Sequence, residues 1–278
     1  MLPRLSQAQA PLTREVEAVD EHGRPQRVAI PAERDLTVYV DKRELVTLMT
    51  LGAHPEWLVL GYLRNQRLVR SVAEVESITV DWEVASAAVK TRVGIERIEE
   101  RTARRVVTTG CGQGSVFGAL MDEVESIRLP DARLEQRTLY AVLEAIRQQE
   151  STYKSAGSVH GCALFQGSRM RLFVEDVGRH NAIDTIAGWM WMQGLSALDA
   201  TADEEPYLFY TTGRLTSEMV IKSAQMGVAL VVSRSGITQM GHDVAQRLGL
   251  CTIGRALNRR FLCYTGPERV RWEPGLAA

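Results

Sequence analysis

The chain has 278 residues, of which 45% are hydrophobic and 24% are charged, and its formal net charge is −1. Such a composition is typical of a globular protein in water, and the near-neutral charge argues against bulk nucleic-acid binding, which needs a positive excess. The sequence has no run of 18 apolar residues and no apolar signal segment, and its four cysteines lack paired spacing. These features predict a cytoplasmic protein without a transmembrane helix.

The N-terminal part predicts a flexible tail over residues 1–24 and a smaller, mainly β subdomain over residues 25–104. Stretches rich in β-branched and aromatic residues predict four strands in this subdomain, at 36–40, 44–49, 77–82 and 87–93. Pro55 suits the first position of a helix, and the apolar residues after it predict one helix between the strands. The charged stretch 95–105 marks a domain boundary.

Strands and helices alternate over residues 105–278, which predicts a layered α/β/α domain around a mixed sheet. The predicted strands lie at 106–109, 159–165, 170–176, 207–211, 228–233, 251–256 and 261–265. The second and third of these are expected to form a hairpin across the turn 166–168. The predicted helices lie at 115–124, 137–149, 181–193, 217–226 and 238–248.

Three loops repeat one pattern, in which a strand ends in small polar residues and a helix begins. They lie in 106–115 (VVTTGCGQGS), 208–218 (LFYTTGRLTSE) and 231–238 (VVSRSGIT). Free backbone N–H groups and the helix dipole can bind an anion at each loop, so the three together suit a ligand with several phosphates. The alternative is that turns of α/β proteins need small residues in any case. None of the loops is a P-loop or a dinucleotide-binding fingerprint.

Cys111 is the candidate nucleophile, because it lies between two glycines, after a predicted strand and just before a predicted helix. Glycine neighbours expose a sulfur atom, and a helix N-terminus favours the thiolate. A buried cysteine in a turn is the alternative. Cys162, Cys251 and Cys263 instead lie in apolar strand sequences, which predicts that all three are buried and unreactive.

A second candidate region, 174–184 (VEDVGRHNAID), concentrates polar residues at a predicted strand-to-helix junction. Asp176 is a candidate helix cap, which would place Arg179 and His180 near the helix N-terminus, beside any ligand bound there. The alternative is that His180 and Asn181 are capping groups whose hydrogen bonds are satisfied within the protein.

The sequence predicts no metal site. A C-x-x-C pair starting at Cys111 is broken by Gly114, and His160 is followed by Cys162 without the glutamate of a zinc deaminase. A nucleoside or base deaminase, which needs both zinc and that glutamate, is therefore disfavoured.

Taken together, these segments resemble the formate dehydrogenase accessory sulfurtransferase family. The strongest likeness is in 175–189 (EDVGRHNAIDTIAGW). The cysteine loop 108–118 and the segments 211–236 and 249–270 follow the family pattern in order and spacing, and the likeness runs from about residue 27 to 271.

The resemblance implies a fold similar to that of the cytidine deaminases without their zinc site, a homodimer, and no catalytic metal of the protein's own. It implies that sulfur is taken from a cysteine desulfurase and transferred to molybdenum bis(pterin guanine dinucleotide), a bound substrate, before this cofactor enters formate dehydrogenase.

The resemblance also assigns site residues. It gives the catalytic role to Cys111 and assigns cofactor contacts to Phe261, Leu262, Cys263, Tyr264, Thr265 and Gly266. Position near the predicted helix N-termini adds further candidate contacts to the cofactor, namely Arg214, Lys222, Arg234, Arg179 and His180.

One departure from the family concerns the mechanism. Many members carry a second cysteine in the cysteine loop, whereas this chain has Gly114 there. Cys111 is then the sole carrier, which is chemically sufficient because a persulfide can itself deliver sulfur to a metal. The main alternative function is a chaperone that binds the molybdenum cofactor without carrying sulfur.

Overall fold

The computed structural model describes residues 1–95, 126–199 and 204–276. The chain divides into two compact units, each built from separate stretches. The first unit comprises Met1–Gly94, Gln149–Gly161 and Val174–Met192, and the second comprises Ile95–Gln148, Cys162–Phe173 and Gln193–Ala278. The first unit thus includes two stretches that the sequence grouped with 105–278. The predicted boundary at 104 lies outside the described residues, so that division of the chain stays a prediction.

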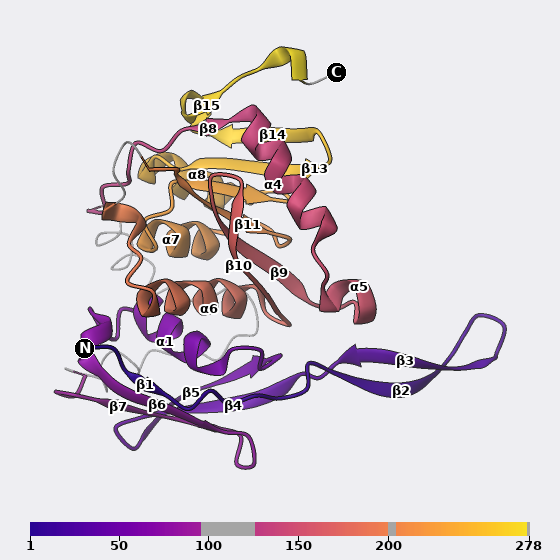
Figure 1. Ribbon diagram of the computed structural model, residues 1–278, viewed down its shortest axis with the longest axis vertical. Coiled ribbons are helices and arrows are strands. Elements are labelled where there is room, and N and C mark those ends of the chain that lie inside the picture. The colour runs from indigo at the N-terminus through magenta and orange to yellow at the C-terminus, as the bar shows by residue number, and fades with distance from the viewer. Residues whose placement is uncertain (96–125, 200–203, 277–278) are drawn as a thin grey trace. The chain divides into compact units, whose positions relative to one another are not determined.

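A five-stranded sheet organises the first unit, in the order β1-β6-β7-β4-β5 (Figure 1). Its strands are β1 (Arg4–Leu5), β4 (Arg34–Val40), β5 (Arg43–Thr50), β6 (Val75–Asp81) and β7 (Ser86–Thr91). The alternation in β4 buries Leu36, Val38 and Val40 on one face. The four strands predicted between 36 and 93 are confirmed.

A separate antiparallel hairpin is formed by β2 (Thr13–Val19) and β3 (Pro25–Pro31), which Figure 1 shows extending from this sheet. Its turn is closed by Asp20, whose carboxylate accepts hydrogen bonds from the backbone N–H groups of His22 and Arg24, both at 2.9 Å. The hairpin and β1 correct the prediction of a flexible tail over 1–24. That tail was predicted because the N-terminal sequence is polar and carries acidic residues early.

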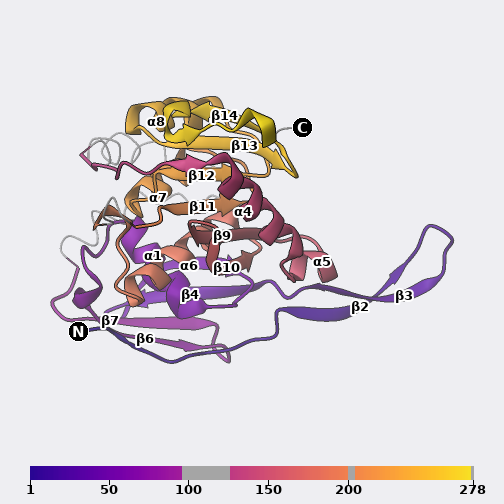
Figure 2. The same ribbon diagram turned by 45° about the horizontal axis from the view of Figure 1, so that its top comes forward.

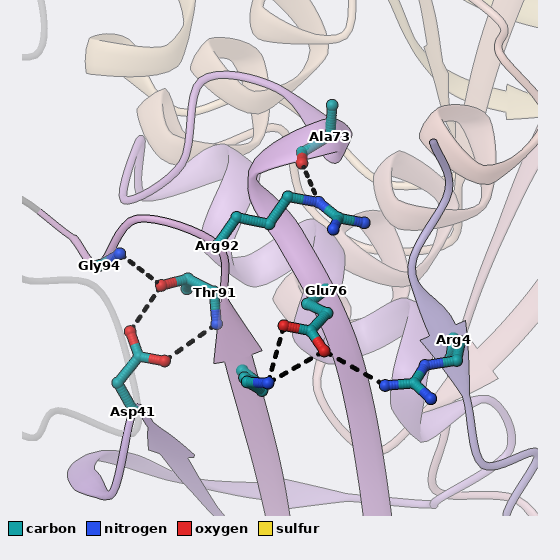
Figure 3. Close-up of polar contacts among 8 residues, drawn as sticks. Arg4, Asp41, Ala73, Glu76, Thr91, Arg92 and Gly94 are labelled. Carbon is teal, nitrogen blue, oxygen red and sulfur yellow. Dashed lines mark hydrogen bonds and ion pairs between the residues drawn. The ribbon is translucent and has the colours of Figure 1, made fainter.

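Polar contacts anchor the end of β7, a few residues before the first described segment of the chain ends at residue 95. Asp41 accepts hydrogen bonds from the backbone N–H of Thr91 at 2.9 Å and from its hydroxyl at 2.6 Å, and that hydroxyl accepts one from Gly94 N–H (Figure 3). On β6, Glu76 accepts a hydrogen bond from Arg4, which ties β1 to the sheet. The last described strand before the cysteine loop in the sequence is therefore fixed at its C-terminal end by hydrogen bonds.

Two helices of the first unit, α1 (Pro55–Asn65) and α6 (Arg179–Met192), touch backbone to backbone. A Cβ atom on Gly61 would lie 1.7 Å from the carbonyl oxygen of Asp184, and one on Gly188 would lie 2.0 Å from that of Trp57. Only glycine permits this approach. The helix predicted after Pro55 is confirmed, and α6 begins two residues before the helix predicted at 181. The short helix α5 (Thr152–Ala156) and the 3-10 turn Val72–Glu74 complete the unit.

A mixed six-stranded sheet organises the second unit, in the order β10-β9-β11-β12-β13-β14. Its strands are β9 (His160–Gln166), β10 (Arg169–Asp176), β11 (Tyr207–Thr211), β12 (Leu230–Ser233), β13 (Cys251–Leu257) and β14 (Arg260–Thr265). β11, β12 and β13 are parallel, whereas β9 and β14 run antiparallel to their neighbours. The mixed sheet and the hairpin predicted across 166–168 are confirmed.

Three helices accompany this sheet: α4 (Gln136–Gln148), α7 (Ser217–Gln225) and α8 (Gln239–Leu248). α4 runs along the sheet in Figure 2, and its Leu139, Val142 and Leu143 join one apolar cluster with strand residues such as Phe165 and Ile253. α7 and α8 pack on each other. The helices predicted at 137–149, 217–226 and 238–248 are confirmed to within one residue at each end.

Short elements finish the second unit: β8 (Leu134–Glu135) pairs with β15 (Val270–Arg271), and 3-10 turns lie at Ala197–Asp199, Pro267–Arg269 and Pro274–Leu276. The predicted strand 106–109 and helix 115–124 lie outside the described residues. Among the described helices, none is both long and apolar enough to span a membrane. The mixed α/β class is confirmed, and the likeness to cytidine deaminases stays a prediction.

The glycine contact between α1 and α6 yields a stability prediction. Gly61→Ala would normally stabilise a helix, but here its methyl group must displace α6, so we expect the free energy of unfolding to fall by about 1–3 kcal/mol. Urea unfolding of the whole protein measures this change. Gly275→Ala is the matched control, because nothing lies within 4 Å of an added Cβ there. Equal stability of the two variants would show that α6 can move away at no cost.

Candidate functional site

Hydrogen bonds join the loop that follows β11 to the loop that follows β12. The Ser233 hydroxyl donates to the carbonyl oxygen of Gly213 at 2.6 Å, and Leu215 N–H donates to the carbonyl oxygen of Gly236 at 2.9 Å. Leu215 and Ile237 also form an isolated parallel bridge. The two predicted anion loops are therefore one structure, since the parallel strands end side by side at the same edge of the sheet.

The two helices that start at these loops differ at their N-caps. The hydroxyl of Thr238 accepts a hydrogen bond from Gly241 N–H at 3.2 Å, as expected of a cap on α8. Thr216 caps α7 without a side-chain hydrogen bond, and its buried hydroxyl has no partner within the described residues. A buried unpaired hydroxyl costs about 1–3 kcal/mol. Among the described residues, the cap of α7 therefore lacks the side-chain hydrogen bond that the cap of α8 has.

The three predicted phosphate partners in this unit lie in different surroundings. Arg214 and Arg234 are exposed on the two tied loops. Lys222 lies in the second turn of α7, is 3% exposed, and has its Nζ 3.6 Å from a carboxylate oxygen of Glu218. Because Glu218 balances its charge inside the helix, Lys222 is a weaker candidate for a phosphate contact than the two arginines.

The predicted cofactor strand, β14, presents its residues on two faces. Phe261 packs against the apolar cluster formed by α4 and the strands of the sheet. Its ring stacks on that of Trp272, with the ring centroids 6.1 Å apart. Leu262 is 48% exposed, and the Tyr264 ring lies against Gly254, where an added Cβ would come within 2.8 Å of the ring. The six residues 261–266 therefore do not form one continuous surface.

The last two residues of that stretch have structural contacts. Thr265 is buried, and its hydroxyl donates to the carbonyl oxygen of Leu250 at 2.8 Å and contacts the hydroxyl of Thr252 at 2.7 Å. Gly266 has a left-handed φ of +64° and lies against the backbone of Cys251. Both residues shape the exit from β14.

The cysteines do not all fit the sequence prediction. Cys162 and Cys251 are buried, as expected, and the Cys162 thiol donates to the Thr211 hydroxyl at 3.3 Å. The prediction is wrong for Cys263, which is only partly buried. Cys111 lies outside the described residues, so its role stays a prediction.

In the first unit, Asp176 organises the start of α6. One carboxylate oxygen accepts hydrogen bonds from Gly178 N–H at 3.0 Å and from the Asn181 amide at 2.9 Å. The other accepts from the Thr50 hydroxyl at 2.5 Å and from Leu51 N–H at 3.0 Å. Burial raises the pKa of Asp176, and these four donors oppose that rise. Asp176 thus binds the residue before α6, as the predicted cap should, and also joins β5 to it.

The residues after Asp176 were predicted to bind a ligand. Arg179 and His180 form the first turn of α6 and are half-buried. Asn181 also donates to the carbonyl oxygen of Met49 at 2.6 Å, which agrees with the alternative that it is satisfied within the protein. The ligand contacts of Arg179 and His180 stay predictions.

Sequence reasoning missed the structural roles of three residues in the same motif. Glu175 accepts hydrogen bonds from the backbone N–H groups of Thr152 and Tyr153 at the start of α5, Asp184 accepts one from Asn65 on α1, and Gly188 forms the close helix contact. The signal available was the density of acids and glycines in 175–189, but their partners lie more than twenty residues away in the chain.

Comparison with known proteins decides the family. Residues 31–271 match the model of the FdhD/NarQ family. The chain belongs to the FdhD/NarQ family. The matched range includes Cys111, both tied loops, β14 and the 175–189 motif. Among the described parts of this FdhD/NarQ member, no three histidine, cysteine, aspartate or glutamate side chains gather as metal ligands.

Relatives of this FdhD/NarQ member include two proteins named sulfur carrier protein FdhD. That of Bacillus subtilis (strain 168) is 30% identical over 241 residues, which are 86% of this chain and 89% of the relative. That of Listeria innocua is 26% identical over 245 residues, covering 87% and 91%. A crystal structure from Desulfotalea psychrophila, described as a formate dehydrogenase accessory protein, is similar with a TM-score of 0.73 at 22% identity, covering 94% of this chain and 100% of that one. The likeness to that structure supports the fold.

The Asp176 network yields the prediction for this site. Asp176→Ala leaves several buried donors without an acceptor, so we expect the free energy of unfolding to fall by about 3 kcal/mol, and Asp176→Asn, which keeps one oxygen acceptor, to lose less. Urea unfolding measures both changes. Asp131→Ala is the control, because that side chain is 78% exposed. Should Asp176→Ala be as stable as this control, the four hydrogen bonds would not hold the start of α6.

Proposed function

We propose that this chain is a sulfurtransferase of formate dehydrogenase maturation, which carries sulfur as a persulfide on Cys111. Family membership over residues 31–271 carries the proposal, because this range includes Cys111 and because relatives matched over most of their length are named sulfur carrier proteins. Cys111 has glycine on both sides, at 110 and 112, and glycine has no side chain that could hinder a partner's backbone.

The proposed first step is a thiol exchange. The Cys111 thiolate attacks the terminal sulfur of a persulfide on a cysteine desulfurase, the donor's S–S bond breaks, and the donor cysteine leaves as a thiolate. The terminal sulfur is then bound to Cys111 as a persulfide. No disulfide forms within the cysteine loop, because position 114 is glycine and the loop holds no second thiol.

The proposed acceptor is molybdenum bis(pterin guanine dinucleotide), bound as substrate before it enters formate dehydrogenase. Its pyrophosphates carry negative charge, which suits a helix N-terminus. The buried hydroxyl of Thr216, which has no partner among the residues that the structure describes, and the exposed Arg214 and Arg234 support a phosphate at the start of α7. Residues 261–266, Arg179 and His180 remain candidate contacts to the rest of the cofactor.

The proposal includes the setting in which the protein works. The cysteine desulfurase is the donor and formate dehydrogenase is the client, and the protein acts in the cytoplasm as a homodimer. The similar crystal structure, described as a formate dehydrogenase accessory protein, supports the client, and the remaining parts follow from the resemblance of the sequence.

The persulfide is tested by mass spectrometry. After incubation with a cysteine desulfurase and cysteine, the intact wild-type protein should gain one sulfur, about 32 Da, that reductant removes. Cys111→Ala should gain none, whereas Cys162→Ala, which changes a buried thiol, should gain it as the wild type does. Sulfur retained by Cys111→Ala would refute the proposal. Full maturation of formate dehydrogenase with Cys111→Ser would favour the chaperone instead.

The phosphate site is tested with GDP, a fragment of the proposed substrate. Millimolar GDP should raise the melting temperature of the wild type by mass action. Thr216→Val should reduce this shift without lowering the melting temperature of the free protein, because the hydroxyl it removes is unpaired.

Thr238→Val is the matched control for that variant. It removes a hydroxyl that caps α8, so the free protein should lose about 1 kcal/mol of stability. A wild type that shows no shift with GDP, or a Thr216→Val variant with the full shift, would contradict the site at α7.

A further inference from the structure

Two cysteines outside the cysteine loop come together in the second unit. Cys251 is the first residue of β13, and Cys263 lies in β14, the antiparallel neighbour of β13. Both contribute to the apolar cluster that includes α4 residues, Cys251 as a buried member and Cys263 packed against it. The two cysteines are therefore part of one cluster on neighbouring strands.

A β-bulge brings both side chains to the same face of the sheet. Between the first two pairs of the β13–β14 ladder the register shifts by one residue, so that Ile253 pairs with Cys263 where a regular ladder would place Tyr264. Side chains alternate along a strand, so Cys251 shares the face of Ile253 and now also that of Cys263. Without the bulge, Cys263 would point to the opposite face.

The two thiols differ in reactivity. Hydrogen bonding with Cys251 lowers the pKa of Cys263 below its ordinary value although desolvation opposes this, and the Cys263 thiol donates to the carbonyl oxygen of Thr265 at 3.4 Å. The same hydrogen bond, together with burial, raises the pKa of Cys251. Cys251 is fully buried, whereas Cys263 is partly accessible. Because Cys263 is the accessible thiol of the pair, an external disulfide reaches it first, and the buried Cys251 lies behind it.

We propose that Cys263 and Cys251 form a thiol–disulfide exchange site for small-molecule disulfides of the glutathione class. The Cys263 thiolate attacks one sulfur of the external disulfide, whose S–S bond breaks and releases one thiolate. Cys251 then passes its proton to that thiolate and attacks the Cys263 sulfur, which expels the second thiolate. In total, two protein thiols are oxidised to a disulfide and one external disulfide is reduced to two thiols. The step does not depend on the proposed role of Cys111.

The test follows the disulfide directly. The full-length protein is incubated with oxidised glutathione, free thiols are blocked with iodoacetamide, and peptides are mapped by mass spectrometry. We expect a peptide pair linked through Cys251 and Cys263 in the wild type, and its complete loss after reduction. In Cys251→Ser the reaction should stop at a glutathione adduct on Cys263, and in Cys263→Ser Cys251 should stay unmodified.

Two controls separate this site from the other cysteines. Cys162→Ser and Cys111→Ser should both form the linked peptides as the wild type does, and the second keeps the outcome independent of the proposed sulfur carrier. The wild type needs no substitution, so misfolding of a variant cannot hide the result. Absence of the linked peptides in the wild type, or Cys162 reacting with glutathione before Cys263, would overturn the proposal.

Discussion

The close approach of α1 and α6 is the constraint on which the first unit depends. Gly61 and Gly188 leave no side chain between the helices, so each backbone contacts the other. At this spacing Asn65 reaches the Asp184 carboxylate at 2.6 Å, and Arg64 reaches the carbonyl oxygen of Ala187 at 2.9 Å. These contacts fix the middle of α6 and therefore the direction in which its first turn, with Arg179 and His180, points.

The same constraint changes the interpretation of the 175–189 motif. Five of its polar or small residues have partners inside the first unit: Glu175, Asp176, Asn181, Asp184 and Gly188. A motif this dense in acids looks like a binding site in the sequence, but buried carboxylates must be paired wherever they occur. Much of its chemistry therefore holds α6 in place, and a ligand contact by Arg179 and His180 in the first turn stays a prediction.

In the second unit, hydrogen bonds between the loops and a bulge in β14 decide which side chains meet. Ser233 and Leu215 join the loops after β11 and β12, so Thr216, Arg214 and Arg234 belong to one edge of the sheet. The bulge moves Cys263 to the face of Cys251. Neither effect follows from residue type. A serine in a loop or a cysteine in a strand has the same conformational preference whichever residue it meets in the folded protein.

The sequence by itself determined the elements with strong patterns. Apolar alternation placed β4–β7, helical periodicity placed α4, and the repeated strand–loop–helix pattern placed the loops after β11 and β12. It failed for β2, whose polar and acidic sequence suggested a loose tail, and for Cys263, whose apolar neighbours suggested burial. Only the tertiary structure decided the glycine contact, the unpaired Thr216 hydroxyl and the cysteine pair, since each depends on residues distant in the chain or on a one-residue shift in register. Periodicity reports which side of an element is buried, and it carries no information about which residue lies opposite.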